Sequence, residues 1–308
     1  MRAVDLFAGC GGLSLGLKRA KIEVTLAIDA WEPAVECYSA NFDHPIELFD
    51  LGNEEAAADR VKAEAPDLIA GGPPCQEFSH AGKRQEGDRA NLTLSYANIV
   101  AAVLPQYFIM ENVDRAEKSD AFKAAERVFR KAGYGLTKVV LNASRCGVPQ
   151  NRKRFFCIGC IDAADNFLLQ ELTDGQRRPM TVKEFLKDDI DIDFYYRHPR
   201  NYSRRAIYSV NEPAPTMRGV NRPVPAGYPG HVGDAAPITS DLRALTTLER
   251  ARIQTFPKRF KWIGTKTNIE QMIGNAVPVD LAKYVGKRVY NHFMTADPAK
   301  YREFQLVG

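Results

Sequence analysis

The sequence lacks the features of a membrane-spanning or secreted protein. Its 308 residues contain no run of about 18 consecutive apolar residues, which a membrane-spanning helix would need. The first residues, Met1 to Phe7, include an acidic side chain and lead into glycines, so they predict a strand instead of a signal peptide. The cysteines are scattered without the spacing of a disulfide framework, which predicts a reducing, cytoplasmic location. They are Cys10, Cys37, Cys75, Cys146, Cys157 and Cys160.

A metal-binding pattern is also missing. Cys157 and Cys160 form a CxxC motif, a spacing that zinc sites use. No second cysteine pair or histidine pair follows at zinc spacing, and residues 155–161 are apolar, like a buried strand. The sequence therefore predicts no bound metal.

Acidic residues are scarce in one segment. The net charge is only +4, but residues 197–222 hold six arginines and a single acid, Glu212, whereas 165–193 hold four basic and eight acidic residues. Tyrosines are interleaved with the arginines. This mixture suits contacts with phosphates and bases, although a solvated surface is the usual explanation of a charge cluster. The six are Arg197, Arg200, Arg204, Arg205, Arg218 and Arg222.

The first 160 residues alternate short apolar runs with helical patterns. This alternation predicts an α/β fold with a parallel, doubly wound sheet. The expected strands are 3–7, 24–29, 46–50, 68–71, 107–111, 136–142 and 155–161. The expected helices in this part are 54–65, 91–104 and 121–132.

The alternation stops near residue 163. Residues 163–245 are rich in Pro, Gly, Arg, Tyr and Asn and have no sustained periodicity, so they predict a second, irregular domain or a disordered segment. A helical pattern returns at 248–256 and 279–293, and the last helix is expected to pack on the first domain. We therefore divide the chain into a first domain, 1–162, a second domain, 163–245, and a return to the first, 246–308.

A glycine-rich turn follows the first expected strand. In DLFAGCGG, residues 5–12, the glycines allow a tight turn that brings the backbone close to a ligand at the start of a helix. Asp29 and Asp50 end the next two strands, where an acid can accept hydrogen bonds from a ribose or an adenine amino group. The spacing differs from GxGxxG, which favours an adenosine cofactor without a pyrophosphate. The alternative is that both acids are ordinary turn residues.

A stiff turn carries one cysteine. GGPPCQEFS, residues 71–79, places Cys75 behind two glycines and two prolines, directly after an apolar run. A thiol held rigidly at a strand end is typical of a nucleophile that its substrate must approach closely. A buried turn with an incidental cysteine is the alternative.

Five motifs occur in a fixed order, and they are DLFAGCGG, GGPPCQEFS, ENV at 111–113, QNRKR at 150–154 and GNAVP at 274–278. Together they resemble the DNA cytosine-5 methyltransferase family, over residues 1–160 and 243–293. The resemblance implies a Rossmann-like methyltransferase sheet with a smaller target-recognition domain at 163–245. It also implies S-adenosylmethionine as the methyl donor and a cytosine flipped out of double-stranded DNA as the substrate.

The resemblance implies a set of cofactor residues. Phe7 would stack near the adenine, Asp29 would hold the ribose and Asp50 would accept from the adenine amino group. The family often has an aromatic residue directly after the aspartate, whereas this chain has Ala30 and then Trp31, which becomes the candidate. The remaining members of the set are Ala8, Gly9, Gly11, Gly12, Leu51, Pro73, Leu92, Asn275 and Val277.

The resemblance assigns the central chemistry to Cys75. C5 of cytosine is too weak a nucleophile by itself, and adding a thiolate to C6 turns the ring into an enamine that can attack a methyl group. Glu111 would contact N3 and the exocyclic amine, for which it needs a raised pKa. Arg154 would donate to O2 of the base, and Arg152 would brace the loop that carries the cysteine.

Two groups of residues are expected to contact DNA. One follows the cysteine, and the other lies in the arginine-rich segment. Because arginine pairs well with guanine in the major groove, a target that contains G or C is expected. The first group is Gln76, Ser79, Lys83 and Arg84. The second group is Arg204, Arg205, Arg218, Asn221 and Arg222.

The sequence leaves two alternatives open. One is a tRNA cytosine-5 methyltransferase, but that branch has Thr where this chain has Ser79 and a much reduced recognition region. The other is a catalytically silent DNA-binding relative, although both Cys75 and Glu111 are present. The length leaves no room for chromatin-reading domains. We therefore expect a monomeric prokaryotic or phage enzyme, nucleoid-associated in the cytoplasm, which is solitary or paired with a restriction endonuclease of the same specificity.

Overall fold

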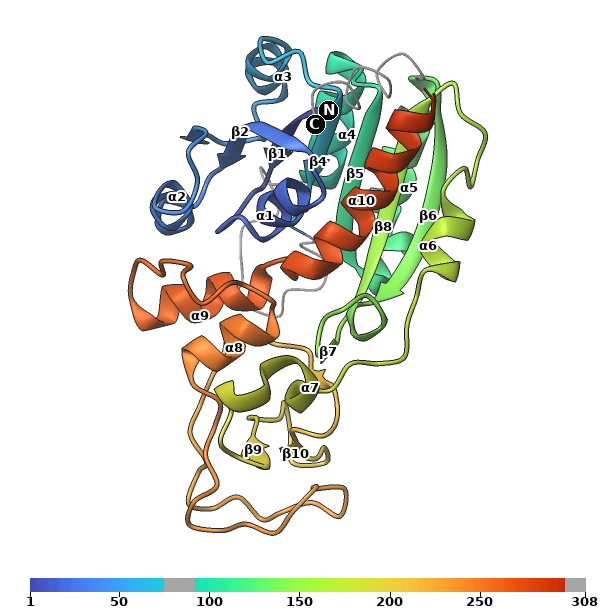
Figure 1. Cartoon of the computed structure of the whole chain (residues 1–308). Coiled ribbons are helices and arrows are strands. Elements are labelled where there is room, and N and C mark those ends of the chain that lie inside the picture. Colours follow the sequence, from blue (N-terminus) through green and yellow to red (C-terminus); the bar gives the residue numbers. More distant parts are fainter. Residues whose placement is uncertain (75–91, 297–308) are drawn as a thin grey trace.

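A seven-stranded sheet forms the centre of the computed structural model, which describes residues 1–74 and 92–296 (Figure 1). The strand order is β3-β2-β1-β4-β5-β8-β6. The strands are β1 (Arg2–Leu6), β2 (Glu23–Asp29), β3 (Ile46–Leu48), β4 (Leu68–Gly71), β5 (Tyr107–Val113), β6 (Tyr134–Asn142) and β8 (Lys153–Ile161). Every strand that the sequence predicts is present, and its ends differ by no more than two residues.

The sheet is not parallel throughout, which corrects the expectation. β1 pairs in parallel with β2 and β4, and β4 pairs in parallel with β5. β8 runs antiparallel to both of its neighbours, β5 and β6. Only residues 143–152 connect β6 to β8, whereas a crossover between parallel strands takes about a dozen residues or more. The short connection therefore forces the chain to reverse, and β8 inserts between β5 and β6.

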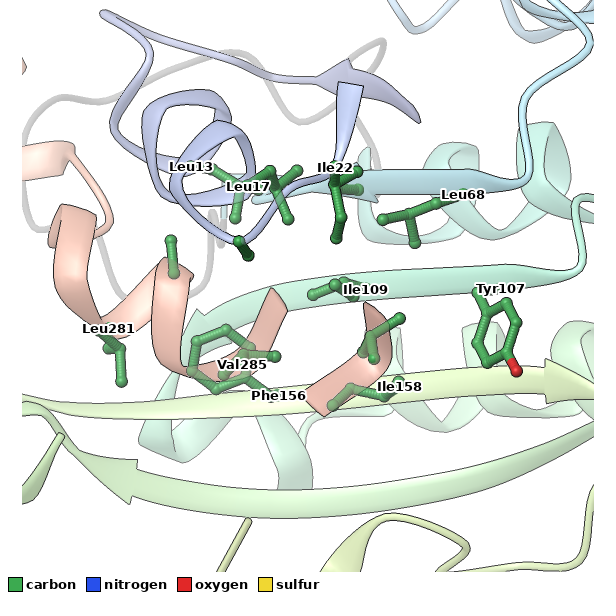
Figure 2. Packing of buried hydrophobic residues seen from close by; sticks show 14 of the residues in the cluster. Leu13, Leu17, Ile22, Leu68, Tyr107, Ile109, Phe156, Ile158, Leu281 and Val285 are labelled. Carbon is green, nitrogen blue, oxygen red and sulfur yellow. The ribbon is translucent and has the colours of Figure 1, made fainter. Parts of the chain in front are cut away.

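Helices cover both faces of the sheet, because a buried strand sends alternate side chains to opposite faces. Leu68 packs on one face with α1 and α10, as Figure 2 shows, and Ile69 packs on the other face with α3, α4 and α5. The expected closing helix is thus present as α10. The helices of this part are α1 (Gly12–Arg19), α2 (Glu32–Ser39), α3 (Glu54–Lys62), α4 (Leu92–Val103), α5 (Asp120–Lys131) and α10 (Val279–Ala296).

The two cysteines of the CxxC motif lie on opposite faces of β8. Cys157 is buried in the cluster with α4 and α5, and Cys160 is buried in the cluster with α10. Ligands on opposite faces of a sheet cannot share one ion. Within residues 1–74 and 92–296, no group of three or more His, Cys, Asp or Glu side chains is placed to hold a metal. No helix in these residues is both long and apolar enough to span a membrane.

The core of the sheet extends past residue 162. Leu168 and Leu172, at the short helix α6 (Leu169–Asp174), are buried in the same apolar cluster as α10. Tyr284 of α10 donates a hydrogen bond to the carbonyl oxygen of Leu172 at 2.8 Å. α6 therefore packs with the sheet, and a separate apolar cluster begins at Val182.

Residues 182–245 contain the arginine-rich segment, and we call them the second unit. They are packed and not disordered. The second unit has two small apolar clusters, one around Tyr195 and Val210 and one around Tyr196 and Tyr228. In Figure 1 this unit lies below the sheet, beyond α8 and α9. β11 pairs with β7 and so joins the two units. The elements outside the sheet are η2 (Asp114–Lys118), η3 (Ala143–Arg145), β7 (Gln150–Asn151), α7 (Val182–Leu186), η4 (Lys187–Asp189), β9 (Phe194–Tyr196), β10 (Ile207–Ser209), β11 (Ala214–Pro215), α8 (Thr247–Ile253) and α9 (Lys266–Asn275).

Candidate active site

The turn after β1 has the backbone shape that its glycines predict. Gly9 and Gly11 have φ angles of 55° and 93°, in the left-handed region. A Cβ at Gly11 would clash with the ring of Phe42, and a Cβ at Gly12 would clash with the carbonyl oxygen of Val277. A Cβ at Gly9 would meet nothing within 4 Å. Packing therefore explains two of these glycines, whereas Gly9 borders open space that a ligand can enter.

Asp29, at the end of β2, holds this turn in place. Its Oδ2 accepts a hydrogen bond from the N–H of Gly9 and its Oδ1 accepts one from the N–H of Trp31, both at 2.8 Å. Burial raises the pKa of Asp29, and these two N–H groups oppose the shift. Each carboxylate oxygen keeps a further lone pair. Asp29 can therefore also accept from a ribose hydroxyl placed beside Gly9.

The other expected cofactor residues differ in how far they are exposed. Phe7 is half-buried and has a φ of 58°, and Trp31 is half-buried at the start of α2. Asp50 is exposed, and its Oδ1 accepts from the N–H of Gly52 at 2.9 Å. The side chain of Leu51 is buried in the core with α3 and α4. Of the remaining members, Ala8, Pro73 and Val277 are buried, Leu92 is half-buried and Asn275 is exposed.

A buried acid beneath the turn is a feature that the sequence analysis missed. Asp5 is fully buried in β1, and the hydroxyl of Ser14 donates to its Oδ2 at 2.5 Å. Tyr38 donates to the Ser14 hydroxyl at 2.7 Å, and Nε2 of His44 lies 2.6 Å from the Tyr38 oxygen. Burial raises the pKa of Asp5 to about 7, and the hydrogen bond from Ser14 opposes the shift. The available signal was an aspartate inside an otherwise apolar strand.

Residues 71–74, which we name the cysteine turn, lie against the end of β5. The side-chain amide of Asn112 donates to the carbonyl oxygen of Pro73 at 3.0 Å. A Cβ at Gly72 would lie 3.1 Å from Oε2 of Glu111. The GGPP and ENV motifs therefore meet. Cys75, Gln76, Ser79, Lys83 and Arg84 belong to residues 75–91, which lie outside the described residues.

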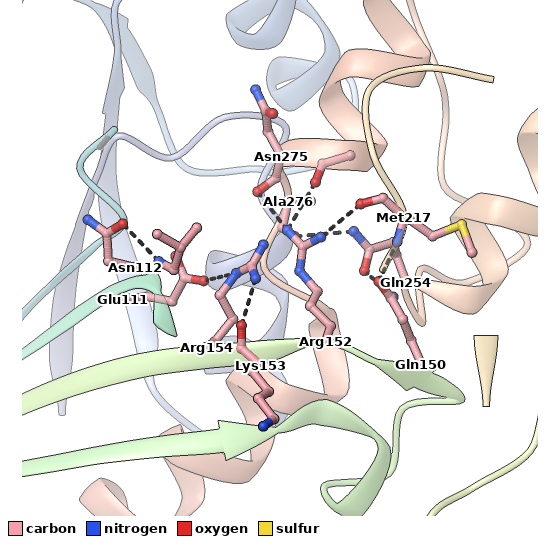
Figure 3. A network of polar contacts seen from close by, with 12 residues as sticks. Glu111, Asn112, Gln150, Arg152, Lys153, Arg154, Met217, Gln254, Asn275 and Ala276 are labelled. Carbon is pink, nitrogen blue, oxygen red and sulfur yellow. Dashed lines mark hydrogen bonds and ion pairs between the residues drawn. The ribbon is translucent and has the colours of Figure 1, made fainter. Parts of the chain in front are cut away.

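Glu111 and Arg154 form a buried ion pair at the ends of β5 and β8 (Figure 3). Arg154 Nε lies 2.8 Å from Glu111 Oε1, and the side chains of Arg154 and Glu111 are 12% and 10% exposed. The antiparallel register explains the contact, because Arg154 pairs with Val113, two residues beyond Glu111 on the same face. Burial raises the pKa of Glu111, although the charges of Arg154 and Arg152 oppose the shift. The pair leaves Oε2 of Glu111 directed towards the cysteine turn.

The loop that Arg152 was expected to brace lies largely in residues 75–91, outside the described residues, and the described hydrogen bonds of Arg152 go to main-chain carbonyl oxygens. Its guanidinium is buried and donates to the main-chain carbonyl oxygens of Met217 and Gly274, both at 3.0 Å. A further hydrogen bond, at 3.1 Å, goes to the carbonyl oxygen of Ala276, and Gln150 accepts from the N–H of Met217 at 2.8 Å (Figure 3). The Arg152 side chain therefore lies between the GNAVP segment and Met217 of the second unit. Within the described residues, Arg152 makes no hydrogen bond to the cysteine turn.

A cavity of about 920 Å³ opens between the two units. Its wall includes Arg154, so the cavity reaches the buried Glu111–Arg154 pair. Asp114 is the sole acidic side chain among the described residues that line it. A cavity with this charge attracts a polyanion. Its cationic residues are Arg115, Arg152, Lys153, Arg154, Arg197, Arg200, Arg204, Arg205 and Arg218.

The arginines that were expected to contact DNA are not equivalent. Arg204, Arg205 and Arg218 all line the cavity. Arg205, however, donates through both outer nitrogens to Glu212, at 3.1 and 2.5 Å, and its guanidinium stacks over the ring of Tyr208 at 4.3 Å. Arg205 is therefore neutralised within the chain. Arg197 and Arg200, which the sequence analysis did not select as contacts, line the same cavity.

Asn221 and Arg222 do not line the cavity. The amide of Asn221 donates to the carbonyl oxygen of Leu245 at 2.8 Å and to Glu270 Oε1 at 3.1 Å. Both N–H donors of this amide are therefore used within the chain. Arg222 is exposed and lies outside the cavity lining.

Comparisons with known proteins agree with this arrangement. A sequence model of the family described as C-5 cytosine-specific DNA methylase matches residues 1–291. The Type II methyltransferase M.HindV of Haemophilus influenzae is 52% identical over 294 residues, which cover 94% of this chain and 97% of that protein. The Type II methyltransferase M.HgiDI of Herpetosiphon aurantiacus is 53% identical over 290 residues, which cover 92% and 93%.

The fold is also similar to that of solved structures. The S. pombe Dnmt2 methyltransferase matches 95% of this chain and 99% of its own, with a TM-score of 0.73 and 19% sequence identity. The Entamoeba histolytica methyltransferase EhMeth matches 95% of this chain and 98% of its own, with a TM-score of 0.67 and 15% identity. At these identities the likeness concerns the fold.

Proposed function

Because the chain belongs to the C-5 cytosine-specific DNA methylase family, we propose that it methylates C5 of a flipped-out cytosine in double-stranded DNA through a covalent adduct at Cys75. The observation that carries this proposal is the buried Glu111–Arg154 pair, which lies beside the cysteine turn and borders the arginine-lined cavity. The pair supplies an acid and a fixed donor at the point where a flipped base would enter.

The turn after β1 fits S-adenosylmethionine, the methyl donor that this family uses. Open space borders Gly9, and the carboxylate of Asp29 retains lone pairs for a ribose. We assign the adenine to the side of the turn near Phe7. When bound, the cofactor supplies an electrophilic methyl group. The chain's own residues orient it: Asp29 fixes the turn, and the closely packed Gly12 and Val277 fix the position of the GNAVP segment against it.

The cysteine thiolate would add to C6 of the base, and the π-electron pair of the C5–C6 double bond would form the new bond from C5 to the methyl group while the bond from the methyl group to sulfur breaks and its electrons stay on the sulfur. The proton on C5 would then leave to water, and its electron pair would restore the C5–C6 double bond as the thiolate is eliminated. Negative charge that develops on the ring would be offset at N3 by Glu111, whose pKa is raised by burial while the charges of Arg154 and Arg152 oppose the shift. Arg154, held by Glu111, is positioned to donate to O2 of the base.

The second unit is assigned to target recognition. Its arginines line the cavity, and Arg152 and Gln150 fix it to the first unit through Met217. One copy carries both the ion pair and the cavity, so we propose that the enzyme works as a monomer. The Type II names of M.HindV and M.HgiDI support a functional pairing with a restriction endonuclease of the same specificity.

The direct test is sequencing of cytosine conversion in plasmid DNA from a methylation-deficient host that expresses this chain. We expect protected cytosines in one short context, and we expect Cys75→Ala and Glu111→Gln to abolish the protection. Calorimetric binding of S-adenosylmethionine to each variant is the control for folding. Unprotected DNA, with wild-type protein that still binds S-adenosylmethionine, would refute the DNA substrate, and purified tRNA would then be tested.

A further inference from the structure

Four arginines of the second unit line the cavity and have no carboxylate partner among the described residues. They are Arg197, Arg200, Arg204 and Arg218. The other cavity arginine of the second unit, Arg205, is paired with Glu212. In the first unit, Arg154 is paired with Glu111, and Arg152 is held by main-chain carbonyl oxygens. We name the four arginines without a carboxylate partner in the second unit the arginine cluster.

The inner half of the arginine cluster is fixed in position. Arg197 donates to the carbonyl oxygen of Thr216 at 2.7 Å, and Arg218 donates to the carbonyl oxygen of His198. The carbonyl oxygen of Arg218 in turn accepts from Arg250. The Nε of Arg218 is buried and has no hydrogen-bond partner within the described residues. A buried cationic N–H without an acceptor is costly, so this donor points to an acceptor that arrives with a ligand.

The outer half of the cluster is free to close on a ligand. Arg200 and Arg204 are exposed, and no described carboxylate lies within ion-pair distance of either. Burial lowers the pKa of Arg218 to about 10, and the charges of Arg197, Arg200 and Arg204 contribute to the shift. All four side chains line one cavity, where their like charges repel one another. An anion between them would relieve this repulsion.

The charge of the cluster distinguishes between two kinds of DNA group. The edge of a guanine is neutral and takes one arginine in a bidentate contact. A neutral edge offsets none of the positive charge of the cluster. A phosphate carries the negative charge and several acceptor oxygens, which match the planar fork of more than one arginine.

We infer that Arg197, Arg200, Arg204 and Arg218 form one oxyanion site, which holds a single backbone phosphate of the bound duplex. This inference rests on the proposed function, in which the cavity receives DNA. It changes the role expected from the sequence, because Arg204 and Arg218 then position the duplex and do not read a guanine.

The first experiment measures the site without DNA. Inorganic phosphate is titrated into the full chain at constant ionic strength, and thermal unfolding is recorded. We expect a saturable rise in Tm for the wild type that is lost in the Arg200→Ala/Arg204→Ala double variant. Both residues are exposed, so the variant should fold. Arg259→Ala, which removes an exposed arginine outside the cavity lining, is the matched control and should keep the rise. An equal rise in all three proteins would overturn the inference.

The second experiment identifies the phosphate on the duplex. In a series of duplexes, each backbone phosphate in turn is replaced by a neutral methylphosphonate. One position should weaken wild-type binding about tenfold, as for a lost charge-assisted contact. The double variant should be insensitive to that position, as in a double-mutant cycle. Its salt-dependence slope should fall by about 0.9 for the lost phosphate contact.

The sequence context in which cytosines are methylated shows whether Arg204 contacts a phosphate or reads a base. If the arginine cluster holds a phosphate, Arg204→Ala should slow methylation at all sites equally and leave the protected context unchanged. Relaxed selectivity at one base pair would instead assign Arg204 to base reading and overturn the inference, while the methyltransferase function stands. Wild-type protein that binds and methylates no DNA would refute the proposed function, and the phosphate titration would then decide the oxyanion site alone.

Discussion

The buried Asp5 carboxyl predicts an unusual dependence of stability on pH. Asp5 is fully buried, and its Oδ1 has no hydrogen-bond partner within the described residues. Asp5→Asn keeps the shape of the side chain and an oxygen that can accept from Ser14, but it cannot ionise. Comparing this variant with the wild type therefore isolates the titration of one group.

The sign and size of the effect follow from the raised pKa of Asp5. The pKa is about 7 in the folded chain against an ordinary value of 3.8, so the folded state binds this proton more tightly. The stabilisation is fully present below about pH 4 and is lost as the pH rises through about 7. At about 1.4 kcal/mol for each pH unit, the complete loss is about 4 kcal/mol. About 2.5 kcal/mol of it falls between pH 5 and pH 8.

The assay is urea denaturation of both proteins at a series of pH values. The variant should gain about 2.5 kcal/mol of unfolding free energy relative to the wild type between pH 5 and pH 8. Asp59→Asn, at an exposed carboxylate on α3, is the control and should show no such change relative to the wild type. A difference between Asp5→Asn and wild type that stays constant with pH would show that Asp5 is ionised throughout, and the reasoning from burial would be refuted.

Three further predictions concern packing, the junction between the two units at Arg152, and catalysis. Gly12→Ala places a methyl group against the carbonyl oxygen of Val277 and should lower the unfolding free energy by about 2 kcal/mol. Gly227→Ala, where a Cβ meets nothing within 4 Å, should change it by less than about 0.5 kcal/mol in the same urea assay. Arg152→Met leaves buried carbonyl oxygens without a donor and should lower the unfolding free energy by about 3 kcal/mol. An unchanged urea midpoint would show that Arg152 does not hold the two units together. Glu111→Gln should lower kcat about a hundredfold or more in single-turnover methylation, with little change in DNA affinity; a loss confined to affinity would contradict a role in the chemical step.

The strands could be predicted because each is an apolar run between turn residues, but their directions could not all be predicted. The apolar run of β8 reads the same for a parallel and an antiparallel strand. Its direction depends on the connection from β6. This connection is too short for a crossover to a parallel strand, so β6 and β8 pair antiparallel. The packing of Leu168 and Leu172 was missed because the short helix α6 has too few residues to show a helical periodicity.

At the site, residues within motifs could be predicted better than their partners. Glu111 and Arg154 meet because Glu111 lies near the end of β5 and Arg154 lies near the start of the antiparallel strand β8. The partners of Arg152 could not be found, since Met217 is 65 residues away and reaches it only through the pairing of β7 with β11. Arg204 and Arg205 are adjacent, yet only Arg205 has its charge neutralised, by Glu212. That difference depends on tertiary placement, which composition cannot reveal.

The junction at Arg152 has a consequence for how target specificity can diverge among related enzymes. Arg152 binds carbonyl oxygens, and Gln150 binds a main-chain N–H, so the joint holds backbone atoms that every amino acid possesses. A Cβ at Gly274 would clash with the backbone of Arg218 and Gly219, so this position requires a residue without a side chain. Side chains of the second unit that take no part in this junction can therefore change between related enzymes, provided that Gly274 and the buried Arg152 are kept.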